Sequence, residues 1–83
     1  MSENDSELRS ALGELRSYVV ALLLDDGKKR AAALAMIGRS EAVVIDRINE
    51  IAADIIGDII IDGDEGEYFV IEDYEDTLRC ELL

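Results

Sequence analysis

Residues 40–71, SEAVVIDRINEIAADIIGDIIIDGDEGEYFVI, decide the fold, because a helical pattern gives way within them to a strand pattern. In the first part, apolar side chains recur at the spacing of one helix face and cover an arc of roughly 140°. Ser40 is a good N-cap, and Gly57 is a typical helix end. The pattern predicts a helix over Glu41–Ile56. Its buried side comprises Val44, Ile45, Ile48, Ile51, Ala52, Ile55 and Ile56.

The residues after this helix change to a strand pattern. Short β-branched and aromatic runs at 58–62 and 67–71 flank a Gly-rich turn at 63–66, which is typical of a β-hairpin. We interpret Asn49, at the border of the helix's apolar arc, as a side chain that hydrogen-bonds to backbone near this hairpin. The sequence therefore predicts a helix followed by a hairpin wing over 58–71, with one face of the wing buried against the helix.

Helical patterns also precede and follow this stretch. Upstream, apolar residues at helical spacing predict a first helix over Ser6–Leu24. An Ala-rich run predicts a second helix over 28–37, which ends at Gly38 because glycine suits a left-handed C-terminal cap. Downstream, Asp73 is expected to cap a short last helix over about Tyr74–Leu82.

Three helices, a hairpin and a short C-terminal helix follow one another in the order of a winged helix-turn-helix domain. We therefore expect a mainly helical, winged-helix-like α+β fold. Residues 1–5 are expected to be a flexible N-terminus. Residues 6–83 are expected to form a single domain, because 83 residues are too few for a second core.

Charge is unevenly distributed along the chain. The formal net charge is −12, with +4 contributed by residues 27–40 and −9 by residues 58–83. The outward side of the predicted 41–56 helix, which would read DNA in a winged-helix protein, carries Asp46, Glu50 and Asp54. Because affinity for duplex DNA comes mainly from Lys and Arg that neutralise phosphates, we expect no nucleic-acid binding.

The residue types of common catalytic sites are absent or misplaced. The chain has no His and no phosphate-binding loop, so it holds no Ser/His/Asp or Cys/His nucleophile system. The acidic turn from Asp62 to Glu67 fails the register of a calcium loop, since Gly66 falls at position 5. An acyl carrier is disfavoured, because the Asp5-Ser6 pair lies in the N-terminal leader. We therefore expect no enzyme activity, no metal and no cofactor.

The sequence also indicates a compartment. The opening MSENDSEL is polar and acidic, unlike the basic and apolar start of a signal peptide. The longest apolar run, Tyr18–Leu24, is far shorter than the roughly 20 residues that cross a bilayer. Cys80 is the single cysteine, so no intrachain disulfide can form. We expect a cytoplasmic protein with no membrane contact.

Part of the chain resembles a known family. Ile48-Asn49-Glu50 is followed by Gly57-Asp58, by an acidic hairpin and by Asp73-Tyr74. This succession resembles the C-terminal module of the tellurite-resistance-associated TerB family (TerB-C) over about residues 38–75. The resemblance implies an interaction or scaffold role in stress-related or phage-defence-related systems, and it supplies no catalytic residues.

Two functions remain open. The first is a protein–protein interaction module that forms a homodimer, since the apolar blocks exceed what one neighbouring helix covers. The second is an inhibitor that mimics nucleic acid and occupies the basic groove of a DNA-binding protein. The partner is in either case a protein of unknown identity. The candidate contact residues are Asp46, Glu50, Asp54, Asp64, Glu65, Glu67, Lys28, Lys29, Arg30, Tyr18, Leu22 and Ile60.

Overall fold

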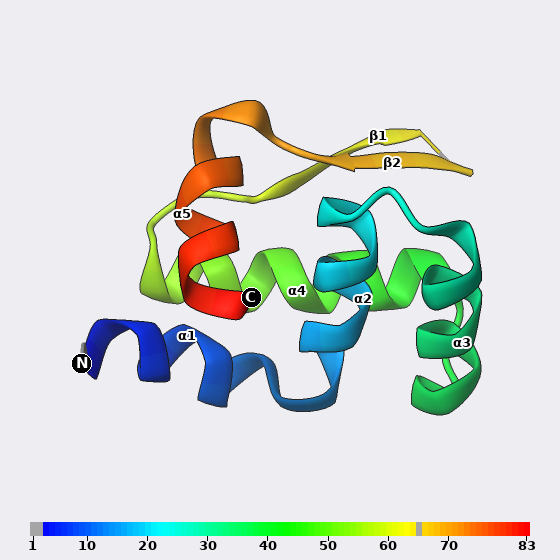
Figure 1. The fold of residues 1–83 in the computed structure, drawn as a ribbon, viewed down its shortest axis with the longest axis horizontal. Helices are drawn as coiled ribbons and strands as arrows, with labels where there is room; N and C mark the ends of the chain where they lie inside the picture. The colour runs from blue at the N-terminus through cyan, green and yellow to red at the C-terminus, as the bar shows by residue number, and fades with distance from the viewer. Residues whose placement is uncertain (1–2, 65) are drawn as a thin grey trace.

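The computed structural model describes residues 3–64 and 66–83, and it has the mainly helical α+β fold that the sequence predicts (Figure 1). A two-stranded antiparallel hairpin lies along one side of the helices. The elements in chain order are α1 (Glu3–Leu12), the 3-10 turn η1 (Gly13–Leu15), α2 (Arg16–Leu23), α3 (Gly27–Ile37), α4 (Glu41–Ile55), β1 (Ile61–Asp64), β2 (Glu67–Val70) and α5 (Glu72–Leu82).

Helix α4 contributes one side of the core and packs on α1 and β1. It runs along the long axis of the molecule, between α1 and the hairpin (Figure 1). Its predicted apolar arc is confirmed at Val44, Ile48 and Ala52, which are fully buried, whereas Ile51 and Ile55 at the borders are half-buried. The other elements add large side chains to this core, namely Leu8, Leu12, Tyr18, Val19, Leu23, Ile60, Ile61, Leu78 and Leu82.

The predicted first helix over Ser6–Leu24 is wrong in one respect, because the structure divides it into α1, η1 and α2. Gly13 has φ +55°, a left-handed conformation that ends an α-helix and that glycine adopts readily. After this break the chain changes direction. Helix α1 then packs on α4 and α5, whereas α2 packs on α3 and β2. The start also differs, since α1 begins at Glu3, inside the segment expected to be a flexible N-terminus.

Helices α3 and α4 have the predicted ends. Gly38 has φ +76° and closes α3, and the Ser40 side chain caps α4 by accepting a hydrogen bond from the Val43 backbone N–H at 3.4 Å. The Asp26 carboxylate accepts bonds from the backbone N–H groups of Lys28 and Lys29 at 3.0 and 3.1 Å. This acidic N-cap offsets the unfavourable position of two lysines at the positive end of the helix dipole.

The start of the last helix is not as predicted. Helix α5 begins at Glu72 with Ile71 as its N-cap residue, and no side chain caps it, so the predicted Asp73 cap is wrong. The Ile71 backbone N–H donates to the Ile60 carbonyl at 2.8 Å, and the Tyr74 N–H donates to the Ile71 carbonyl at 3.0 Å. The helix thus follows the hairpin directly, which places Asp73 inside its first turn.

Asn49 joins α4 to the hairpin, as its interpretation as a backbone-binding border residue predicts. Its Oδ1 accepts hydrogen bonds from the backbone N–H groups of Ile60 and Ile61, both at 3.0 Å. Its Nδ2 donates to the Ile61 carbonyl at 2.9 Å. Because this amide satisfies the backbone of the link, β1 begins at Ile61, later than the predicted strand over 58–62.

Candidate interaction surfaces

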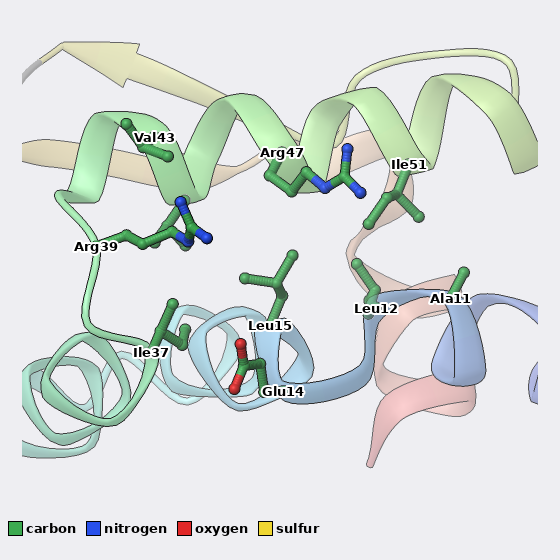
Figure 2. Close-up of a pocket in the computed structure, with 10 residues that line it drawn as sticks. Ala11, Leu12, Glu14, Leu15, Ile37, Arg39, Val43, Arg47 and Ile51 are labelled. Carbon is green, nitrogen blue, oxygen red and sulfur yellow. The ribbon is translucent and has the colours of Figure 1, made fainter.

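A groove between α1 and α4, here called the α1–α4 groove, opens beside the core (Figure 2). It encloses about 480 Å³. Val43, 46% exposed, and the half-buried Ile51 form its α4 wall. The full lining is Ala11, Leu12, Glu14, Leu15, Ile37, Arg39, Val43, Val44, Arg47 and Ile51.

The charged side chains of the α1–α4 groove are mostly basic. Figure 2 shows Arg39 and Arg47 on the α4 side and Glu14 on the opposite side. Arg47 forms an exposed ion pair with Glu50, with 2.8 Å between Nη1 and Oε1. Among the described residues, no acidic side chain pairs with Arg39. The groove therefore combines apolar walls with positive charge, although the chain as a whole is strongly acidic.

A second groove, the α2–α3 groove, lies on the other helical pair. It encloses about 380 Å³. Met36, which is 65% exposed, contributes the most accessible apolar side chain. Two cations, Arg16 and Lys29, complete it, and among the described residues no acidic side chain lines it. The full lining is Arg16, Ser17, Val20, Lys29, Ala32, Ala33 and Met36.

The third surface is the hairpin outer face, formed by Asp62, Asp64, Glu67 and Phe69. In the register of the hairpin, Asp62 lies opposite Phe69 and Asp64 lies opposite Glu67. Cross-strand partners share a face, and so do alternate residues of a strand. All four side chains are exposed, Phe69 at 53%. An aromatic ring is therefore presented to solvent among three carboxylates.

The predicted acidic contact residues lie on the surface. Asp46, Glu50 and Asp54 are exposed on α4, and the last two line a shallow continuation of the α1–α4 groove. Asp64 and Glu67 belong to the hairpin outer face. Glu65 lies outside the described residues.

The predicted basic contact residues differ among themselves. Lys28 and Lys29 are exposed. Arg30 is not free, because its Nη1 lies 3.7 Å from a Glu41 carboxylate oxygen. Lys29 lines the α2–α3 groove, and Arg30 lines a hollow of about 530 Å³ between α2, the hairpin and α5.

Two of the predicted apolar contact residues need correction. Tyr18 and Ile60 are fully buried in the core, and Leu22 is half-buried against it. The apolar runs that contain them are covered within the chain, because the hairpin and α5 pack on α2. In the part of the chain that the structure describes, the large apolar side chains that are exposed are instead Leu24, Met36, Val43, Ile59, Phe69 and Leu83. Period-two alternation of a hairpin could have identified Phe69, whereas no sequence signal indicates the grooves.

Tyr18 forms a polar contact at the edge of the core. Its hydroxyl donates to the Glu41 carboxylate at 2.6 Å, and Glu41 also pairs with Arg30. Burial, the hydrogen bond to Glu41 and the negative charge of Glu41 raise the pKa of Tyr18 above the ordinary tyrosine value. The phenol therefore stays protonated in the folded chain.

This raised pKa predicts a loss of stability in alkaline solution. Because the folded chain holds the Tyr18 proton more tightly than the unfolded chain, its contribution is complete below about pH 10 and declines as the pH rises further. We expect the free energy of unfolding to fall more steeply above pH 10 in the wild type than in Tyr18→Phe, by about 1.4 kcal/mol per pH unit. Urea denaturation at several pH values measures both slopes. Equal slopes would contradict the assignment.

The described residues bring no three His, Cys, Asp or Glu side chains together as a metal site. Each helix in the described ranges is too short or too polar to span a bilayer. Fold and surface together define a small, mainly helical α+β domain with open grooves and an acidic hairpin.

A family model of the TerB-C domain matches residues 3–79. The chain therefore belongs to the TerB-C family, and the match extends well beyond the 38–75 stretch that carries the sequence resemblance. No curated protein and no solved structure matches the chain.

The residues that carry the resemblance are structural in this chain. Asn49 holds the hairpin on α4. Asp58 accepts a hydrogen bond from the Tyr74 hydroxyl at 2.8 Å, which joins the end of α4 to α5. These motif positions thus maintain the fold.

Proposed function

We propose that this TerB-C domain is a non-catalytic protein–protein interaction module and that the α1–α4 groove is its contact surface. One observation carries the proposal: a groove with apolar walls and two arginines opens on a chain whose net charge is −12. Apolar surface of this kind favours a protein occupant, since burial of its side chains supplies binding free energy.

The charge of the groove indicates the occupant's chemistry. Arg39 and Arg47 flank apolar side chains, so a partner segment needs apolar residues for the walls and carboxylates for the guanidinium groups. An amphipathic helix with acidic residues meets both requirements. Val43 and Ile51 are the expected anchors, because they project from α4 and still have surface to bury.

The test uses a change that introduces a charge into the groove without touching the core. Val43→Glu places a carboxylate on the exposed part of α4, where it repels an acidic occupant. Asp76→Lys, at an exposed position of α5, is the control. We expect a partner captured from the native cell to bind the purified domain directly and to bind Val43→Glu at least about tenfold more weakly, while Asp76→Lys binds normally. Equal affinity for all three forms would refute the groove as the contact surface.

The proposal includes self-association and a scaffold role in the cytoplasm. The stress-related setting is what the resemblance to the TerB-C family implies, and the exposed Met36 and Phe69 support contact with a second copy. We also propose that the domain is a variant of the winged-helix fold, because its helices and hairpin follow one another in the order of that fold.

A nucleic-acid mimic is the second candidate. The observation that favours it is the run of exposed carboxylates on α4 and on the hairpin outer face. Such an inhibitor would compete with duplex DNA for a basic protein, and its binding would weaken steeply with salt. Binding that is insensitive to salt and to DNA favours the interaction module.

A further inference from the structure

The hairpin outer face and the α2–α3 groove are complementary in charge and in polarity. The first presents Phe69 among Asp62, Asp64 and Glu67. Within the described residues, no basic side chain pairs with these carboxylates. The α2–α3 groove offers an apolar floor between two cations, and its described lining contains no acid. An exposed aromatic ring fits an apolar floor, and its three carboxylates match a cationic rim.

One copy of the chain cannot bring these two surfaces together. The inner face of the hairpin is held on α2, where Val70 is buried and Tyr68 is half-buried against the core. The outer-face side chains lie on the opposite side of the strands. Phe69 borders a separate hollow with Leu22 and Leu23 of α2. None of the four residues of the outer face is among those that line the α2–α3 groove. Only a second copy, or another protein with the same chemistry, can place an acidic aromatic surface there.

We propose that two copies of this chain bind head to tail, with the hairpin outer face of one copy seated in the α2–α3 groove of the other. This inference rests on the self-association included in the proposed function and names the surfaces that meet. Phe69 lies against Met36 and Val20, and Glu67 and Asp62 face Lys29 and Arg16. The contact is heterologous, so each pair leaves one groove and one hairpin face free for further copies. Association therefore continues beyond the dimer as concentration rises, unless a ring closes.

Charge exchange across the contact provides the test. Lys29→Glu reverses the groove, and Glu67→Lys reverses the hairpin outer face. Both residues are exposed, so neither change disturbs the core. Arg9→Glu and Asp76→Lys make the same changes in net charge at exposed positions outside both surfaces. Sedimentation velocity over about 10 µM to 1 mM reports the association constant of each form.

We expect the wild type to associate with rising concentration and each single variant to associate about three- to tenfold more weakly. We expect the double variant Lys29→Glu/Glu67→Lys to regain much of the association, because the reversed charges again match. Phe69→Ser is expected to weaken association at least about tenfold through lost apolar burial. The controls keep wild-type behaviour.

A wild type that stays monomeric throughout overturns the head-to-tail contact. Association that is unaffected by the three surface variants, or equally weakened by the controls, overturns it as well. These outcomes do not bear on the α1–α4 groove, whose Val43→Glu test uses a different partner and a different surface.

Discussion

Asn49→Ala is expected to lower the free energy of unfolding by about 2–4 kcal/mol. The Asn49 amide makes three hydrogen bonds to the backbone of Ile60 and Ile61, whose side chains are fully buried. Alanine cannot replace any of them. Two backbone N–H groups and one carbonyl then lose their partner in a part of the chain that water reaches poorly, and each unsatisfied group adds its own desolvation cost.

Two matched variants separate this effect from general damage to α4. Asn49→Asp keeps an acceptor for the two N–H groups but loses the donor to the Ile61 carbonyl, so an intermediate loss is expected. Glu50→Ala changes the next residue, which is well exposed, and is expected to stay within about 0.5 kcal/mol of the wild type. Urea denaturation measures all three. A loss below about 1 kcal/mol for Asn49→Ala would show that the hairpin is held by packing instead.

The parts of the fold that the sequence predicts well are those with local signals. Helix α3 ends at Gly38 and helix α4 begins after Ser40, as the sequence predicts, because capping depends on residues within one turn. The break at Gly13 is different. Leucines continue at helical spacing on both sides of it, since α1 and α2 both face the same core, so the pattern indicates one helix. Glycine permits the left-handed conformation at position 13, but a single glycine inside a continuing leucine pattern does not distinguish a break from an uninterrupted helix.

Burial within the chain was harder to predict than the helices. The apolar run at Tyr18–Leu24 and the isoleucines at 59–61 exceed what one neighbour covers, which suggested a partner for Tyr18 and Ile60. In the structure, α2 and the hairpin pack on each other, and α5 packs on α2 beside them. Both Tyr18 and Ile60 are thereby buried within one chain. A sequence pattern shows how much apolar surface a helix or strand has, but it does not show how many other elements of the same chain pack on that surface.

The grooves could not be predicted for a related reason. Each is formed by segments far apart in the sequence, as with Leu15 and Val43 in one and Val20 and Met36 in the other. The positive charge of the α1–α4 groove could not be predicted either. In the sequence, Arg39 and Arg47 look like ordinary solvent-exposed residues, and only the packing of α1 against α4 places them beside apolar walls. The acidic hairpin was visible in the sequence, and its exposed carboxylates at Asp64 and Glu67 follow from alternation along the strands.

Leu78→Ala is expected to cost about 2–5 kcal/mol, because it removes a fully buried side chain and leaves a cavity between α5 and its neighbours. Helix α5 packs on both α1 and α2, and Arg79 donates to the Leu23 carbonyl at 2.9 Å. Two elements that separate at Gly13 are thus held by the same short helix. For a domain of this length, total stability is of the order of 4–12 kcal/mol, so the loss is a large part of the whole.

Cys80→Ala is the matched control, since Cys80 lies two residues further along α5 and is exposed. It is expected to leave the free energy of unfolding within about 0.5 kcal/mol of the wild type. Thermal and urea denaturation, each followed by circular dichroism, compare the two variants. If Leu78→Ala retained nearly full stability, α5 would not be part of the cooperative core. Something other than α5 would then have to hold α1 and α2 together and so fix the relative positions of the α1–α4 and α2–α3 grooves. Among the described elements, no other helix packs as extensively on both α1 and α2.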